Sequence, residues 1–174
     1  MRVIAGELGG RKLVSPDGTS TRPTTDRVRE AVFNALGSSG ILVDAVVADL
    51  YAGTGAVGIE AISRGAAHCT FVERDRAALR ALDGNLANLD LGGRSRVVRS
   101  DAMAVAGAID VDIVFADPPY DFDAWDRLMA SIRAPFVVAE AGRSVDERPG
   151  WTLTRSKRYG RTWVSFLERE GVAA

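Results

Sequence analysis

A short apolar run, a glycine-rich turn and a helical segment follow one another between residues 45 and 64. The run 45–48 has the length of a buried strand, and residues 49–60 read DLYAGTGAVGIE. Its glycines, Gly53, Gly55 and Gly58, have the spacing G-x-G-x-x-G. Because they lack Cβ atoms, a ligand can lie against the turn and over the start of the next helix. This order favours an α/β fold, in which the turn fits a dinucleotide site, an S-adenosylmethionine site or a tight turn with no ligand.

The same alternation of strands and helices continues along the chain. Apolar runs predict further strands at residues 69–72, 96–99, 111–116 and 136–139, with helices at 75–89 and 125–132 between them. Such alternation predicts a mainly parallel, doubly wound sheet. The last two strands, 151–154 and 163–167, are joined by a loop too short for a crossover, so they should pair antiparallel.

The first 40 residues are expected to form an extension to this fold. A hairpin is predicted over residues 2–15, and a helix should begin near Thr24 or Thr25, with an apolar stripe from Val28 to Leu36. We therefore expect an extension at 1–40 and a second domain at 41–174. The chain lacks the apolar run of a membrane span and a signal peptide, and its single cysteine precludes an internal disulfide, so we expect a cytoplasmic protein.

Four carboxylates, Asp49, Glu73, Asp101 and Asp117, fall at the carboxyl ends of the predicted parallel strands, which is the ligand edge of such sheets. They would repel a pyrophosphate but suit S-adenosylmethionine, which has an ammonium, a ribose diol and an adenine amino group. We expect Glu73 to accept the ribose hydroxyls, Asp101 the adenine amino group, and Asp49 to hold the turn and the amino-acid end. The alternative is that such acids only cap helices, as Asp75 is expected to do.

The sequence Asp117-Pro118-Pro119-Tyr120 directly follows the most apolar predicted strand. Its two prolines lack N–H groups and stiffen the exit from the strand. A carboxylate and a fixed carbonyl can accept both N–H bonds of an amino group on a planar base, and Tyr120 can stack on that base. The motif therefore indicates methylation of an exocyclic amino nitrogen, without a strong general base.

Physical reasoning leaves several activities open. The motif would serve adenine N6, cytosine N4 or a glutamine amide as well as guanine. A methyltransferase for protein or small-molecule amides, a non-enzymatic RNA-binding assembly factor and a nicotinamide enzyme are the competing interpretations. The motif at 117–120 has no use in a nicotinamide enzyme.

Charge is unevenly distributed along a chain whose net charge is −1. Residues 1–30 carry six basic and four acidic side chains, residues 154–161 carry four basic and none acidic, and the remainder is acidic. Such asymmetry can create a local anion-binding surface. We expect the basic side chains of both segments to bind RNA phosphates and one aromatic ring to stack on a base. The residues expected to bind RNA are Arg2, Arg11, Lys12, Arg22, Arg155, Lys157, Arg158, Tyr159 and Arg161.

Nearly the whole chain resembles the RsmD family of bacterial 16S rRNA guanine-N2 methyltransferases. The resemblance lies in residues 22–34 (RPTTDRVREAVFN), the turn at 49–60, residues 63–66 and 71–73, and the motif at 117–120. Position 51 is tyrosine where phenylalanine is expected most often. The resemblance implies a seven-stranded sheet with an antiparallel last strand.

The same resemblance implies an activity and a site. The activity is transfer of methyl from S-adenosylmethionine, leaving S-adenosylhomocysteine, to N2 of guanine 966 in 16S rRNA. The substrate would be the small ribosomal subunit or its assembly intermediate, with the enzyme acting as a monomer and without metal. Implied catalytic residues are Asp117, Pro118, Pro119 and Tyr120. Implied cofactor-binding residues are Asp49, Tyr51, Ala52, Gly53, Thr54, Gly55, Glu73, Arg74, Asp101, Ala102 and Asp117.

Overall fold

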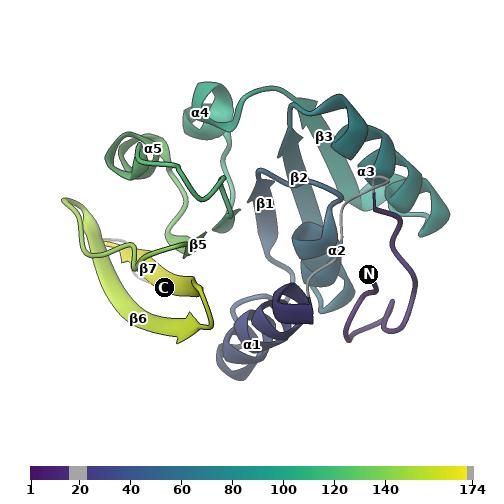
Figure 1. Ribbon diagram of the computed structural model, residues 1–174, viewed down its shortest axis with the longest axis horizontal. Helices are drawn as coiled ribbons and strands as arrows, with labels where there is room; N and C mark the ends of the chain where they lie inside the picture. Colours follow the sequence, from purple (N-terminus) through teal and green to yellow (C-terminus); the bar gives the residue numbers. More distant parts are fainter. Residues whose placement is uncertain (16–22, 172–174) are drawn as a thin grey trace.

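A seven-stranded sheet forms the centre of the molecule (Figure 1). The computed structural model describes residues 1–15 and 23–171, with the side chains of its first helix from residue 26 onward. The strands follow the order β3-β2-β1-β4-β5-β7-β6. Their bounds are β1 Val46–Leu50, β2 His68–Glu73, β3 Ser95–Arg99, β4 Ile113–Ala116, β5 Phe136–Ala141, β6 Trp151–Tyr159 and β7 Thr162–Arg169.

The pairing of the strands confirms the predicted fold class. β3, β2, β1, β4 and β5 are parallel neighbours, and β7 runs antiparallel between β5 and β6. The chain order reverses between β1 and β4, where the crevice at the carboxyl ends of an open α/β sheet binds ligands. A ligand site is therefore expected at the carboxyl ends of β1 and β4.

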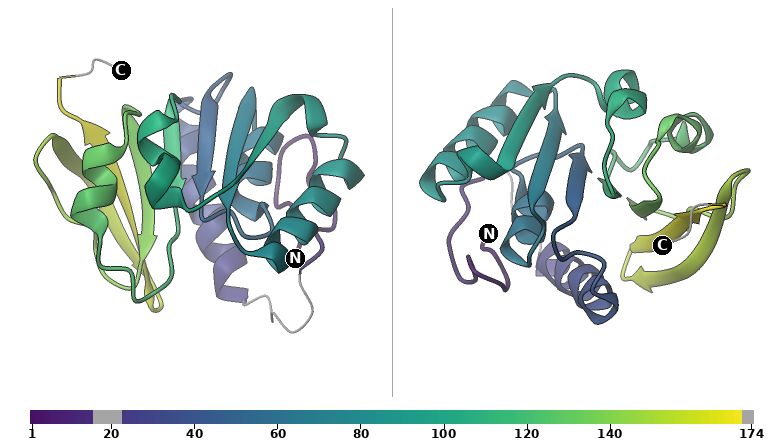
Figure 2. Two further views of the ribbon diagram at one scale, coloured as in Figure 1. Left: turned by 90° about the horizontal axis from the view of Figure 1, so that it is seen from above. Right: turned by 180° about the vertical axis from the view of Figure 1, so that it is seen from behind.

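Helices cover both faces of the sheet (Figure 2). α1 (Pro23–Ser39), α2 (Ala56–Ser63) and α3 (Arg76–Asn88) pack on one face, whereas α4 (Ala102–Val105) and α5 (Trp125–Ser131) pack on the other. α1 begins at a proline, which suits the first turn because the missing N–H has no partner there. α4 was not predicted, because four residues are too few to show a helical period.

The N-terminal segment reverses direction as predicted but forms no two-stranded hairpin. One isolated bridge pairs Arg2 with Lys12. The ladder stops because the next N–H groups bond elsewhere: Ile4 and Ala5 donate to the carboxylate of Glu60, and Leu8 donates to Ser63 Oγ. The segment is thus fastened side-on to α2.

Across residues 1–15 and 23–171, no helix is long and apolar enough to cross a lipid bilayer.

Candidate active site

The glycine turn between β1 and α2 has a backbone that side chains would hinder. Gly53 and Gly55 have φ of 55° and 83°, in the left-handed region that favours glycine. A Cβ on Gly58 would lie 2.3 Å from Phe71 Cε1, so this glycine lets α2 pack closely on β2. Tyr51 also has positive φ, 66°, which is costly for a residue with a side chain. The turn is therefore strained where β1 ends.

Two of the predicted carboxylates accept hydrogen bonds from backbone N–H groups of the glycine motif. Asp49 Oδ2 accepts a hydrogen bond from the N–H of Gly58 at 2.9 Å, and Glu73 Oε2 accepts one from the N–H of Gly53 at 2.8 Å. The contact of Asp49 with the turn agrees with part of its expected role, and its contact with the amino-acid end of a cofactor stays a prediction.

The carboxylate of Glu73 accepts more backbone hydrogen bonds than the sequence suggested. Its Oε1 accepts from the N–H groups of Arg74 and Asp75, each at 2.7 Å. With the bond from Gly53, three of the roughly four lone-pair sites of the carboxylate are taken. One site on Oε2 is left for a ribose hydroxyl, so accepting two hydroxyls requires one backbone bond to be given up.

A cavity of about 470 Å³ lies beside Glu73 and the ends of β2, β3 and β4. Asp101 Oδ1 caps α4 by accepting from Met103 N, and Oδ2 pairs with Arg74 Nη1 at 2.6 Å. The capping alternative thus describes Asp101 as well as Asp75, which caps α3. The cavity also brings together Tyr51, Ala102, Asp117, Pro118, Pro119 and Tyr120.

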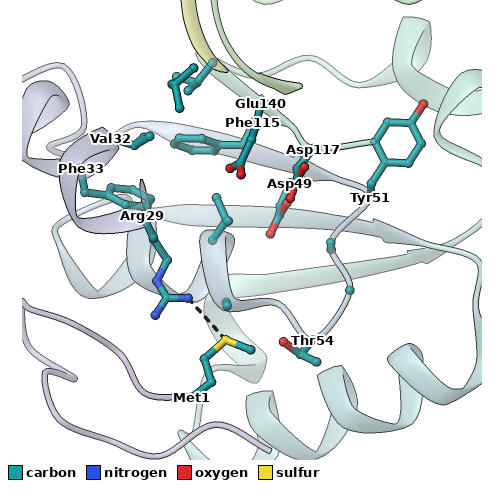
Figure 3. A pocket seen from close by; sticks show the side chains of 16 residues that line it. Met1, Arg29, Val32, Phe33, Asp49, Tyr51, Thr54, Phe115, Asp117 and Glu140 are labelled. Atoms are coloured by element: carbon teal, nitrogen blue, oxygen red, sulfur yellow. Dashed lines mark hydrogen bonds between the residues drawn. The ribbon is translucent and has the colours of Figure 1, made fainter. Parts of the chain in front are cut away.

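A second cavity, of about 220 Å³, lies on the face of the sheet that α1 and α2 cover (Figure 3). Asp49, Asp117 and Glu140 place carboxylates in its wall, and Phe33 and Phe115 supply aromatic surface. The predicted cofactor residues Ala52, Gly53 and Thr54 also line it. Because Tyr51 and Asp117 line both cavities, they stand at the junction between the two.

The carboxylates of the second cavity have raised pKa values. Burial raises the pKa of Asp49 from 3.8 to about 7, although the bond from Gly58 opposes the rise. The surrounding protein reduces the hydration of the Asp117 carboxylate and raises its pKa to about 6. Part of the side chain is still exposed to solvent, through the two cavities that it lines. Burial, and then the charge of Asp117, raise the pKa of Glu140 to about 8, while Arg29 lowers it. Perturbed titration in a cleft is typical of functional sites.

Glu140 and Arg29 are charged side chains in this cavity that were not predicted from the sequence to lie there. Glu140 follows the fifth predicted strand as Asp117 follows the fourth, so the rule that acids lie at strand ends could have found it. Arg29 lies on α1. Its Nη2 donates to Arg2 O at 2.7 Å and to Asp26 Oδ1 at 3.1 Å, which joins α1 to the N-terminal segment.

Tyr120 is 64% exposed at the outer edge of the site. Its ring lies against Gly142, and its hydroxyl is 3.3 Å from Thr162 Oγ1 on β7. Tyr51 differs, because within the described residues its hydroxyl is buried and has no hydrogen-bond partner. Tyr120 can therefore offer an open ring face, whereas the orphaned oxygen of Tyr51 suits a polar group of a bound ligand.

The predicted RNA-binding residues fall into two groups at opposite ends of the molecule (Figure 1). Arg2, Arg11 and Lys12 are exposed on the N-terminal segment, beside α2 and α3. Arg155, Lys157, Arg158 and Arg161 are exposed on β6 and the turn that follows it, at the far edge of the sheet. Tyr159 is half-buried beneath Lys157, so its ring is less open than predicted. Arg22 lies outside the described residues.

Known proteins resemble this chain over nearly its whole length. Ribosomal RNA small subunit methyltransferase D of Escherichia coli (strain K12) is 38% identical over 98% of this chain and 90% of its own length. The Bacillus subtilis (strain 168) protein named "Putative rRNA methyltransferase YlbH" is 39% identical over 98% of this chain and all of its own. The solved structure titled "Putative methyltransferase yhhF from Escherichia coli" superposes with a TM-score of 0.84, at 34% identity and 99% coverage of both chains.

The strand order and the ligand edge define the fold of a class I S-adenosylmethionine-dependent methyltransferase. Residues 1–168 match the model of the family described as "Conserved hypothetical protein 95". The chain belongs to this family, which is the RsmD family.

Proposed function

We propose that this protein transfers a methyl group from S-adenosylmethionine to the exocyclic N2 of guanine 966 in 16S rRNA. The observation that carries the proposal is the position of Asp117 at the junction of two cavities, one of them lined by the glycine turn. A donor whose adenosine part lies in the larger cavity and an acceptor in the smaller one would meet at this carboxylate. The name of the E. coli relative supports the choice of rRNA as substrate.

The residues around the larger cavity fit the adenosine part of S-adenosylmethionine, and its amino-acid end would reach Asp49 and the glycine turn in the smaller cavity. Glu73 keeps an acceptor site for a ribose hydroxyl, and the buried, unpartnered hydroxyl of Tyr51 gains a partner from a polar ligand. Asp101 and Arg74 lie beside the same cavity, where a polar purine edge can exchange bonds with them. When bound, this cofactor supplies an electrophilic methyl group on a sulfonium.

The residues of the motif at 117–120 prepare the acceptor nitrogen. Asp117 and the Pro118 carbonyl accept its two N–H bonds, which turns its lone pair toward the donor. The carboxylate also stabilises the positive charge that develops on nitrogen. With a pKa of about 6, Asp117 is mostly ionised at neutral pH and can accept the proton that the methylated nitrogen loses. Tyr120, with its exposed ring, stacks on the base.

The two basic groups act in this proposal as separate grips on RNA. One lies on the extension at residues 1–40 and the other on β6, so a bound RNA would span the molecule past the mouth of the site. Phosphate contacts position the substrate, and the pocket then reads one flipped base. The net charge of −1 predicts weak binding to naked RNA, with the small subunit or its assembly intermediate as the better partner, met by a monomer in the cytoplasm.

Mass mapping of methylated nucleotides tests the proposal. Small subunits from cells lacking the corresponding activity are incubated with the protein and labelled S-adenosylmethionine, and their rRNA is digested and mapped. One N2-methylguanine at position 966 is expected. Label on adenine, cytosine or ribosomal protein would assign the site to another amino or amide nitrogen. A protein that binds subunits but transfers no label would be an assembly factor.

A further inference from the structure

Glu140 is the direct neighbour of Asp117 across the sheet. The β4–β5 register pairs Ala116 with Ala139, so the next residue of each strand lies opposite the other. Paired residues share a face of a sheet, and adjacent strands are about 4.8 Å apart. Both side chains line the 220 Å³ cavity, and Figure 3 shows their carboxylates directed toward it. Glu140 therefore stands beside the group proposed to hold the acceptor nitrogen.

Within the described residues, the protein provides little that compensates the charge of Glu140. No hydrogen bond from that part of the chain reaches its carboxylate, and the walls nearby are apolar, with Phe115, Val138 and Val164. Arg29 is the one cationic side chain among the described residues that line the cavity, but it already donates to Arg2 O and Asp26. Burial and the charge of Asp117 raise the pKa of Glu140 to about 8. A half-buried carboxylate that accepts no hydrogen bond from the described residues suits a ligand that supplies hydrogen-bond donors.

We propose that Glu140 selects guanine by accepting the N1–H of the base whose N2 is held by Asp117. This inference rests on the proposed function. Guanine carries N1–H and the N2 amino group side by side on one edge, so two adjacent carboxylates meet two adjacent donors. Binding of these donors favours the ionised form of Glu140.

The same carboxylate disfavours the other bases that carry an amino group. Adenine has an acceptor, N1, beside N6, and cytosine has an acceptor, N3, beside N4. An ionised Glu140 would face a lone pair in either case, and a site built for a donor rejects an analogue without it strongly. Glu140 thus supplies the choice of base that the motif at 117–120 alone leaves open.

The test compares guanine with 2-aminopurine, which keeps the 2-amino group but has an acceptor at N1. Reconstituted small subunits carry one or the other base at the target position, and initial rates of methyl transfer give kcat/KM. The wild-type protein should prefer guanine. Glu140→Gln should lose at least about 10-fold on guanine and gain on 2-aminopurine, because its amide can donate to N1. Glu140→Ala should lose on guanine without that gain. Glu147→Gln, an exposed glutamate in the loop before β6, is the matched control.

The outcomes separate the two proposals. If Glu140→Gln leaves the guanine to 2-aminopurine ratio unchanged while the wild type methylates guanine, Glu140 does not read the base. If the ratio stays the same and the Kd for S-adenosylmethionine rises instead, Glu140 holds the ammonium of the donor, and the inference is wrong. If the wild type transfers nothing to guanine, the proposed function fails as well. Thermal unfolding of each variant shows whether it is folded.

Discussion

Glu60, which is fully buried on α2, accepts a hydrogen bond from the backbone N–H of Ile4 at 2.7 Å. It also accepts from Ala5 N and pairs with Arg64 Nε at 2.6 Å. One side chain thus joins the N-terminal segment to the helix that follows the glycine turn. A basic segment proposed to grip RNA is thereby held in fixed position next to the cofactor turn.

Glu60→Gln should loosen this attachment. The amide keeps one acceptor but leaves Arg64 without its anion, and breaking a buried pair typically costs about 3 kcal/mol or more. We expect a lower free energy of unfolding in urea and faster hydrogen exchange in the peptide that contains Ile4 and Ala5. Glu30→Gln, on the exposed side of α1, is the control. Unchanged exchange at residues 4–5 would show that Glu60 does not fasten the segment.

Asp49→Asn should stabilise the protein, and more so at pH 8 than at pH 5. In the unfolded chain Asp49 ionises near pH 3.8, but in the folded protein near 7. Between these values the folded state keeps a proton that the unfolded state has lost, so its stability falls as pH rises, and the penalty persists above pH 7. Asparagine removes the charge and can still accept from Gly58 N, for a gain of up to roughly 4 kcal/mol at pH 8.

Urea unfolding of both proteins at the two pH values measures the difference, with the exposed Asp110→Asn as control. The same gain at pH 5 and pH 8 would mean that the pKa of Asp49 is not raised.

Glu73→Ala should chiefly weaken cofactor binding. It removes the acceptor of Gly53 N at the centre of the turn and the site expected for a ribose hydroxyl. Isothermal titration with S-adenosylhomocysteine should show a Kd raised by at least about 10-fold, the loss of one or two hydrogen bonds to a charged group. Asp83→Ala, on the exposed side of α3, serves as control. An unchanged Kd would place the ribose elsewhere.

Asp117→Ala should separate turnover from binding. Because Asp117 is proposed to act on the acceptor nitrogen, cofactor affinity should stay near that of the wild type, while kcat should fall at least about 100-fold, as for loss of one preorganised electrostatic group. Steady-state methyl transfer and cofactor titration on the same sample measure both. Near-normal turnover would remove Asp117 from the mechanism, and Asp110→Ala should leave both values unchanged.

The basic strand β6 should contribute phosphate contacts that salt weakens. Arg155→Gln with Lys157→Gln should reduce the slope of log K against log salt concentration by up to about 1.4, or ~0.7 for each contact to single-stranded RNA. Filter binding to a small-subunit RNA fragment across a salt series measures this. Arg2→Gln with Lys12→Gln tests the opposite end in the same way. A pair whose removal leaves the slope unchanged does not grip phosphate.

Local patterns in the sequence were enough to determine the α/β class, the glycine turn and the acids at the strand ends. Strand and helix periods depend on neighbouring residues, and acids after parallel strands must reach one edge whatever the packing. The family resemblance added that the strands form one seven-stranded sheet whose last strand is antiparallel.

Long-range packing alone decided the rest. Glu140 stands beside Asp117 because of the β4–β5 register, and no local pattern encodes which strands pair. Ile4 bonds to Glu60 instead of completing a hairpin because α2 lies within reach of its N–H. The raised pKa of Asp49 comes from burial by elements distant in the chain. The separation of the two basic groups likewise reflects strand order, since charges counted along a sequence say nothing about which ends of the fold they occupy.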